Sequence, residues 1–359
     1  MKFDSIGIED EDIRQIAQCK NLNFLDSEKN VKISNESLYL ISSLKKLTHL
    51  NLSDSIRVTK DAFHYLSGLV ELKNLKLRNC KLSETSFLKN LTKIRNLDIS
   101  GTDVKKPIFP GLVNLTNLDI SRTRIKDRYM NFQKFSKLKK LIMSECSLID
   151  GSGFQNLKEL CSVKANTKYR LSELNLSRCF SLTDNGFSFF QTAKHITSLD
   201  LSYCFRLTDK SFKMLTKYFF LRRLFLSHCI MTEESFDNIS TLENLTDLNF
   251  NSCNISNVSI AKLTSLKKLR ILNLAHTGIT EDGLVSLIPL SKLTSLNISF
   301  CNEIGFGLQS LLMITSLLAL DISYSNITQE GFDFFSLMTN ITSLDISGLE
   351  VSDISRLLF

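Results

Sequence analysis

Cysteine is the residue type in this chain that could support the widest chemistry, because a thiolate can bind zinc, act as a nucleophile or form a disulfide. Seven of the nine cysteines occupy one position of a recurring sequence block, where other copies carry serine or threonine. A position that exchanges among these types is selected for small size and weak hydrogen bonding. Zinc needs ligands that converge on one point, so the sequence predicts a structural ladder, with no metal and no cofactor. The ladder cysteines are Cys80, Cys146, Cys179, Cys204, Cys229, Cys253 and Cys301, and the exchanged residues include Ser55, Thr102, Thr123, Thr277 and Ser325.

The serines and histidines form no recognisable catalytic group. The serines that follow the strand leucines recur as a second ladder, without the glycines of a nucleophile elbow. His228 and His276 share one column but lie two copies apart, on the order of 10 Å, which is too far to share a metal. We therefore expect no enzymatic activity; the alternative is an enzyme that uses Cys161 and a neighbouring basic insertion. The glycines Gly101, Gly186, Gly278 and Gly331 are expected in turns, not in a phosphate-binding loop.

A repeat positions all of these residues. The block L-x-x-L-x-L-x-x-C/S/T recurs along nearly the whole chain, as in Leu171–Cys179 and Ile196–Cys204. Its alternation predicts a short strand with inward leucines, and a Thr or Asp in the following turn, as in Leu207–Asp209, can cap a helix. The second leucine of each copy is Leu50, Leu75, Leu97, Leu118, Leu141, Leu174, Leu199, Leu224, Leu248, Leu272, Leu296, Leu320 or Leu344, with a weaker copy at Leu25. An apolar spine is expected at the start of the helices, formed by Phe63, Phe87, Phe154, Phe187, Phe212, Phe236, Leu284 and Phe332.

The repeat resembles the cysteine-containing subfamily of leucine-rich repeats, which includes the repeat region of F-box substrate receptors of ubiquitin ligases. The resembling residues are the blocks that end in the ladder cysteines and the turns such as Leu207–Asp209. The resemblance implies an α/β leucine-rich-repeat solenoid, a horseshoe with a parallel sheet on its concave face and helices on its convex face. We expect one such domain over residues 1–359, with about 14 repeats. Repeat-like sequence begins at Ile8–Ile13, so no F-box domain is expected in this chain.

Two irregularities interrupt the repeat. Between Leu75 and Leu141 the spacing of the marker leucines shrinks to 22, 21 and 23 residues, and Pro107 and Pro110 fall on the convex side. Proline disfavours helix interiors, so we expect extended or short helical turns there and a locally flatter solenoid. An insertion near 155–170 is equally consistent with a partner-contact loop and with a neutral insertion.

Composition favours an intracellular protein. The net charge of +7 is uneven: residues 1–170 carry 30 Lys and Arg against 19 Asp and Glu, whereas residues 171–359 carry 14 against 18. No stretch reaches the roughly 18 apolar residues of a membrane span, and the acidic amino terminus does not resemble a signal peptide. An odd number of cysteines indicates free thiols in a reducing compartment. The abundance of Lys, Asn, Ile and Phe is typical of an AT-rich genome, which raises the hypothesis of a bacterial effector in host cytoplasm.

Outward side chains of the strands and of the adjacent turns are the candidates for partner contact. An aromatic and histidine ridge in the carboxyl half has the composition of an interaction hot spot; the alternative is that loops tuck these rings against the sheet rim. The candidate residues are Arg178, Tyr203, Arg223, Phe225, His228, His276, Phe300 and Tyr324. A secondary basic surface comprises Lys76, Arg78, Arg95, Arg122, Lys164, Lys168, Tyr169 and Arg170. Nucleic-acid binding is not expected, because it normally combines basic and stacking groups.

The sequence thus predicts a protein-interaction scaffold that binds a partner on its concave face and carboxyl-half rim. The specific hypotheses are a substrate adaptor of the ubiquitin-ligase type and a bacterial effector acting in a host cell. The alternative is a static structural subunit of a larger assembly. Its basis is the apolar half-repeat Ile354–Phe359, which would need a polar cover, supplied by self-association or by a docked subunit.

Overall fold

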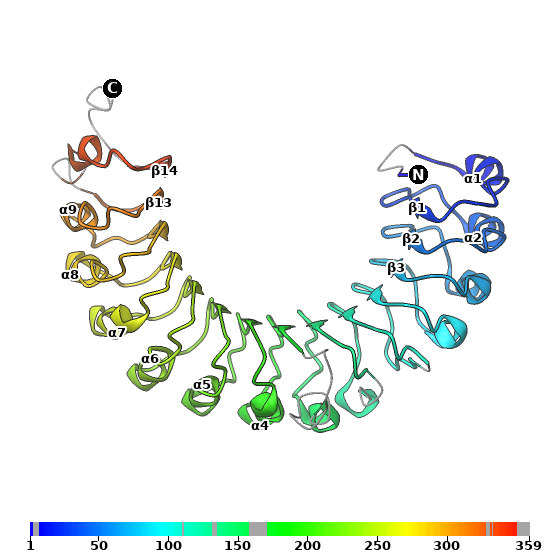
Figure 1. Ribbon diagram of the computed structural model, residues 1–359, viewed down its shortest axis with the longest axis horizontal. Helices are drawn as coiled ribbons and strands as arrows, with labels where there is room; N and C mark the ends of the chain where they lie inside the picture. Colours follow the sequence, from blue (N-terminus) through cyan, green and yellow to red (C-terminus); the bar gives the residue numbers. More distant parts are fainter. Residues whose placement is uncertain are drawn as a thin grey trace. The chain divides into compact units, whose positions relative to one another are not determined.

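A computed structural model describes residues 1–2, 7–109, 111–130, 135–157, 171–327, 331 and 333–349. The chain divides into two compact units, Met1–Ala193 (unit 1) and Lys194–Phe359 (unit 2). In each unit, successive coils place their strands along an inner edge and their helices along an outer edge (Figure 1).

Unit 1 contains a sheet of short parallel strands in which each strand pairs with the next one along the chain, leucine opposite leucine. The strands are β1 (Phe24–Asp26), β2 (His49–Asn51), β3 (Asn74–Lys76), β4 (Asn96–Asp98), β5 (Asn117–Asp119), β6 (Lys140–Ile142) and β7 (Glu173–Asn175). The helices are α1 (Asp10–Ile16), α2 (Asn35–Ile41) and α4 (Asp184–Ser188), and the 3-10 helices are η1 (Lys60–Gly68), η2 (Ser86–Asn90), η3 (Asp127–Tyr129), η4 (Ser152–Leu157) and η5 (Phe189–Thr192).

Unit 2 repeats the same arrangement with more α-helix. Its strands are β8 (Ser198–Asp200), β9 (Arg223–Phe225), β10 (Asp247–Asn249), β11 (Ile271–Asn273), β12 (Ser295–Asn297), β13 (Ala319–Asp321) and β14 (Ser343–Asp345). Its helices are α5 (Asp209–Leu215), α6 (Glu233–Ile239), α7 (Asn257–Lys262), α8 (Glu281–Val285) and α9 (Leu308–Leu311), with 3-10 helices η6 (Leu263–Ser265) and η7 (Phe334–Leu337).

The core lies between the strands and the helices of each coil. The middle leucine of every strand from β1 to β13 is buried, whereas most of its neighbours on the strand are half-buried or exposed, as the alternating pattern predicts. The expected spine is also present: Phe63, Phe87, Phe154, Phe187, Phe212, Phe236 and Leu284 are all buried at the start of their helices. Phe332 lies outside the described residues.

The short coils of unit 1 differ from the others on their helical side. No helix lies between β4 and β5 in the described residues, and η2 and η3, in the short coils on either side, are of the 3-10 type. The expectation of extended chain or short helical turns around Pro107 is therefore confirmed. A coil with fewer residues has too little chain to cross the core and still complete α-helical turns, because each α-helical residue advances the chain by only about 1.5 Å. The flatter curvature expected there stays a prediction.

Two of the glycines expected in turns are helical instead. Gly186 lies within α4, and Gly331 is also helical, whereas Gly101 occupies a turn with a φ of +67°. Gly186 contacts the backbone of the preceding coil, so a Cβ there would lie 2.1 Å from the carbonyl oxygen of Asp150. The expectation was wrong because close approach between coils, which the sequence pattern does not reveal, selects glycine at this position.

Polar side chains join the helices of successive coils. The expected caps are present: the hydroxyl groups of Thr183, Thr208 and Thr232 accept hydrogen bonds from backbone N–H groups of α4, α5 and α6. The structure adds a carboxylate from the preceding coil. Asp209 at the start of α5 accepts a hydrogen bond from the Thr232 hydroxyl at 2.8 Å and another from Ser235. The carboxylates of Asp10, Asp127 and Glu233 likewise accept hydrogen bonds from the coils that follow them. Each of these carboxylates thus orients the next helix.

We expect Asp10→Asn to destabilise unit 1 by about 1 kcal/mol near neutral pH, as removal of a helix cap does. Burial alone would raise the pKa of Asp10, but hydrogen bonds from Ser34 and Ser37 outweigh it and lower the pKa below its usual value. A carboxyl group whose folded pKa is lowered stabilises the protein above its unfolded pKa and loses that contribution as the pH falls. The difference in unfolding free energy between the two proteins should therefore shrink on acidification from pH ~6 toward pH ~3.

The measurement is denaturant unfolding of both proteins across that pH range. Asp61→Asn is the matched control, because Asp61 also lies in the first turn of a helix, η1, but no hydrogen bond among the described residues joins its carboxylate to the next coil. If the difference in unfolding free energy between Asp10→Asn and the unaltered protein stays constant with pH, the carboxylate does not have the proposed role.

Candidate protein-binding surface

The candidate ridge follows one backbone position that recurs in the turn after each strand. At this position φ is positive, between +53° and +65° in the non-glycine residues. The left-handed region favours glycine and, among other residues, asparagine, aspartate and histidine, and it is unfavourable for bulky residues such as phenylalanine and tyrosine. Unit 1 places Lys29, Asp54, Asn79, Gly101, Arg122, Glu145 and Arg178 there, whereas unit 2 places Tyr203, His228, Ser252, His276, Phe300, Tyr324 and Gly348. We call the unit 2 set the ring column.

The rings of this column stack on one another. The ring centroids of Tyr203 and His228 are 4.1 Å apart with planes 20° from parallel. After Ser252, a second stack runs from His276 to Phe300 at 4.1 Å and from Phe300 to Tyr324 at 4.7 Å. Tyr324 in turn covers Gly348, where a Cβ would lie 2.4 Å from the ring. Coil spacing in a parallel sheet is about 4.8 Å, so identical turn positions bring rings to stacking distance.

The stacked rings retain large surfaces in contact with solvent. Tyr324 is 55% exposed and Phe300 is 40% exposed, His276 is exposed, and Tyr203 and His228 are half-buried. Phe205, which the sequence analysis did not select, contacts Tyr203 edge-to-face at 6.1 Å. It directly follows the ladder cysteine, where several other coils carry a polar residue, and that contrast was the signal available in the sequence. The ring column therefore presents two stacks of aromatic and imidazole rings, one on each side of Ser252.

On the strand face, most residues next to the ring column serve the turn itself. The Oδ1 atom of Asp200 accepts a hydrogen bond from the backbone N–H of Ser202 at 3.0 Å. Equivalent bonds recur along both units, which explains why this column is rich in Asp and Asn. Phe225 replaces this acceptor with a half-buried ring, beside the exposed Arg223. Ile271, which the sequence analysis missed, is 45% exposed on the next strand but one.

The secondary basic surface is less uniformly cationic than its composition suggests. The Arg78 guanidinium lies 3.2 Å from the Asp54 carboxylate and 3.6 Å from that of Glu28, and the hydrogen bond to Asp54 raises the pKa of Arg78. Arg78 is thus neutralised locally by two carboxylates. Lys76, Arg95 and Arg122 are exposed on the same unit. Lys164, Lys168, Tyr169 and Arg170, together with the insertion near 155–170 from residue 158 onward and Cys161, lie outside the described residues.

The seven ladder cysteines are buried free thiols. The Cys80 thiol donates a hydrogen bond to the carbonyl oxygen of Leu52 in the preceding coil at 3.1 Å, and Cys146, Cys179, Cys229, Cys253 and Cys301 make equivalent bonds. Burial raises the pKa of Cys80 to about 12 and those of Cys146 and Cys253 to about 11, so these thiols stay protonated near neutral pH. Within the part of the chain that the structure describes, no cluster of His, Cys, Asp and Glu could hold a metal ion.

Parallel strands in leucine register, a buried Cys/Ser/Thr ladder and helices on the opposite side of most coils define an α/β leucine-rich-repeat solenoid. Residues 265–287 and 290–305 match the family model described as Leucine Rich repeat. Among curated proteins, none matches the chain by sequence. Folds of this type are typically protein-interaction scaffolds. The similarity to F-box substrate receptors stays a prediction.

Solved structures with the same fold include two internalins. An internalin (inlF) from Listeria monocytogenes is 18% identical with a TM-score of 0.63, over 97% of this chain and 91% of that one. The functional domain of InlJ from Listeria monocytogenes, which includes a cysteine ladder, is 17% identical with a TM-score of 0.59, over 89% of this chain and 66% of that one. The mouse RP105/MD-1 complex contains a chain that is 24% identical with a TM-score of 0.50, over 68% and 41%. These identities establish likeness of fold alone.

A membrane-spanning helix is absent from the described residues, none of which form a helix of sufficient length and apolar character. Three expectations stay predictions: a single domain over residues 1–359, the intracellular location, and the need for a cover at Ile354–Phe359. The segment Ile354–Phe359 lies outside the described residues.

Proposed function

We propose that the chain is a protein-interaction scaffold that binds its partner through the ring column of unit 2 and the adjoining strand residues Arg223, Phe225 and Ile271. The observation that carries this proposal is a run of partly exposed rings that includes tyrosine and phenylalanine at a backbone position that does not favour those two residue types. A non-glycine residue in the left-handed region costs about 1 kcal/mol relative to glycine. Asparagine, which unit 1 uses at Asn79, would reduce this cost.

Stacking offsets that cost only in part. An aromatic pair contributes about 0.5–1.5 kcal/mol, but the exposed area of Phe300 and Tyr324 stays in contact with water. Folding alone therefore gives little reason for rings at this position. A partner that covers them would gain from apolar burial, and the stack fixes their orientation before binding, which lowers the entropic cost of association. Tyrosine and arginine are also the residue types enriched at the centres of protein interfaces.

We also propose a cellular compartment and two specific roles for this scaffold. The eight cysteines within the described residues are all free thiols, which supports a reducing, intracellular compartment. There the chain would act as a substrate adaptor of the ubiquitin-ligase type or as a bacterial effector in host cytoplasm. Co-purification with a ligase subunit would support the adaptor, whereas transfer into host cells by the producing bacterium would support the effector.

The test replaces rings without disturbing the turn. We expect Phe300→Asn combined with Tyr324→Asn to abolish recovery of the partner by the tagged chain from its native cell. Asparagine tolerates positive φ, so the turn should persist and the unfolding free energy should change by no more than about 1 kcal/mol. Quantitative mass spectrometry of the captured proteins measures the loss.

Arg122→Asn combined with Glu145→Asn is the matched control, because both residues occupy the same turn position in unit 1. Recovery should persist in this control. If the ring variant captures the same proteins in the same amounts as the unaltered chain, the ring column is not the partner surface.

A further inference from the structure

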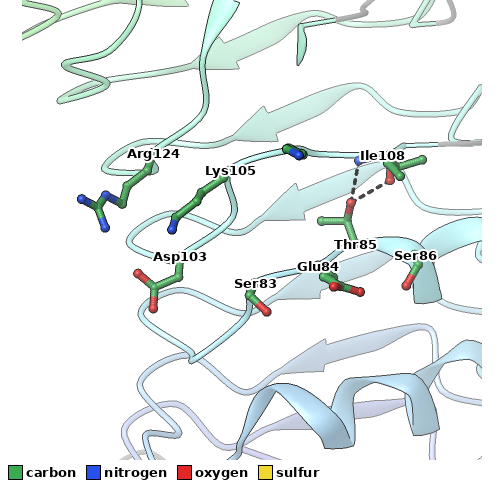
Figure 2. Close-up of a pocket in the computed structure, with 9 residues that line it drawn as sticks. Ser83, Glu84, Thr85, Ser86, Asp103, Lys105, Ile108 and Arg124 are labelled. Atoms are coloured by element: carbon green, nitrogen blue, oxygen red, sulfur yellow. Dashed lines mark hydrogen bonds between the residues drawn. The ribbon is translucent and has the colours of Figure 1, made fainter. Parts of the chain in front are cut away.

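A second surface of distinct chemistry lies in unit 1, along the loops that follow β3, β4 and β5. A hollow of about 640 Å³ is lined by Glu84, Asp103, Lys105, Lys106 and Arg124, among others (Figure 2). An adjoining hollow of about 420 Å³ shares Lys105, Lys106 and Arg124 and adds Lys126, Arg128, Tyr129 and Leu148. The two hollows share three cations and therefore adjoin each other. We call the set Lys105, Lys106, Arg124, Lys126, Arg128 and Tyr129 the basic groove.

The short coils create this groove. The loop between β4 and β5 contains Pro107 and no helix in its described residues, and the Thr85 hydroxyl fixes it to the preceding coil. That hydroxyl donates to the carbonyl oxygen of Ile108 and accepts from its backbone N–H, both at 2.8 Å (Figure 2). Where neighbouring coils carry a helix, this coil leaves the space open. Lys105 and Arg124 then extend from successive coils toward the same side.

In the loop after β5, side chains alternate between buried and exposed, and the exposed ones add further positive charge to the groove. Ile125 is fully buried, whereas Arg124 and Lys126 on either side of it are exposed, so their side chains project together from an extended segment. Residues two apart in extended chain are separated by about 6.6 Å. An extended peptide laid alongside would present every second side chain at the same interval. The spacing therefore suits alternate carboxylates along a bound strand.

The cations of the groove form no ion pairs within the part of the chain that the structure describes. Lys105, Lys106, Arg124, Lys126 and Arg128 are all exposed, and none forms an ion pair with another described residue. Five clustered cations repel one another and create a positive potential that attracts an anionic ligand. Glu84 and Asp103 line the larger hollow beside these cations, and their carboxylates would repel a ligand that is anionic along its whole length.

Tyr129 helps to distinguish the classes of anionic ligand. Its ring already carries the Arg128 guanidinium at 4.8 Å from the ring centroid and the Lys106 ammonium at 5.4 Å. Binding of single-stranded nucleic acid depends on open aromatic faces for stacking of bases. A ring engaged by two cations offers little such surface. Leu148, which is 45% exposed at the same end, offers instead an apolar contact for a side chain.

We propose that the basic groove binds an extended acidic peptide segment of a protein partner. Its carboxylates would form charge-assisted hydrogen bonds with Lys105, Arg124, Lys126 and Arg128, and an apolar residue of the peptide would rest on Leu148. Past the acidic run, donors of the peptide would meet Glu84 and Asp103. This site is separate from the ring column and does not depend on it.

The experiment measures binding of a fluorescently labelled peptide in which aspartate and leucine alternate, by anisotropy with the full chain. We expect Lys105→Glu combined with Arg124→Glu to weaken binding by roughly tenfold or more, because charge-assisted contacts become repulsive. Lys45→Glu combined with Lys60→Glu is the control of equal net charge in the same unit, away from the groove. It should leave binding within about twofold of the unaltered chain.

Lys105→Gln combined with Arg124→Gln provides a milder change, and circular dichroism verifies that each variant folds. Three results would overturn the proposal: no binding of the acidic peptide, equal weakening by both charge-reversal pairs, or tighter binding of a single-stranded oligonucleotide of matched charge. The last result would assign the groove to nucleic acid.

Discussion

Replacing Phe236 with alanine is expected to lower the free energy of unfolding of unit 2 by about 3–5 kcal/mol, the usual cost of truncating a fully buried phenylalanine. Phe236 is 1% exposed at the start of α6. Its ring lies 5.3 Å from that of Phe250, which follows β10 in the next coil. The substitution therefore removes packing within a coil and also across the boundary between two coils, and a solenoid depends on that boundary for stability.

Urea or guanidinium unfolding followed by circular dichroism measures this loss. Phe219→Ala is the matched control in the same unit, because Phe219 is 64% exposed and its truncation should cost less than about 1 kcal/mol. If the two substitutions destabilise the protein equally, the spine does not carry the stability that its burial implies.

The second large effect is expected from Gly186→Ala, which should destabilise unit 1 by about 3 kcal/mol through overpacking. The added Cβ would lie 2.1 Å from the Asp150 carbonyl oxygen and 2.6 Å from the Gly151 Cα. Both neighbours are backbone atoms, so no side-chain rotation relieves the overlap. Elsewhere in a helix, alanine in place of glycine would be favourable by about 1 kcal/mol, so the sign of the effect reports the close approach.

Gly278→Ala provides the comparison, because its Cβ would meet only one atom, the Ile255 carbonyl oxygen at 3.5 Å, which is an ordinary contact. This variant should be neutral or slightly stabilised. Thermal unfolding of the two variants side by side decides the point: a Gly186→Ala protein as stable as the unaltered chain would mean that the coils separate at little cost.

Much of the fold could be read from the repeat because the relevant interactions are local and periodic. Leu174 and Leu199 mark equivalent positions of neighbouring blocks, and inward leucines at a fixed interval require parallel strands in register. Thr208 before α5 and Pro107 in the short coil also act through their own backbone, so the helix cap and the missing helix were predictable. The turn bond between Asp200 and Ser202 is equally local, since an Asp side chain commonly accepts a hydrogen bond from the backbone two residues on.

The candidate surfaces depended on contacts between coils, which a linear pattern does not contain. The sequence by itself determined the repeat, the leucine register, the cysteine column and the aromatic composition of the ridge. Only the tertiary structure decided that the turn holds Phe300 and Tyr324 at positive φ and in stacks, that Arg78 is paired with Asp54 and Glu28, and that Lys105 and Arg124 border one groove. The reason is physical: periodicity fixes which residues share a column, whereas the distance between coils and the backbone angle at each turn fix what those residues touch.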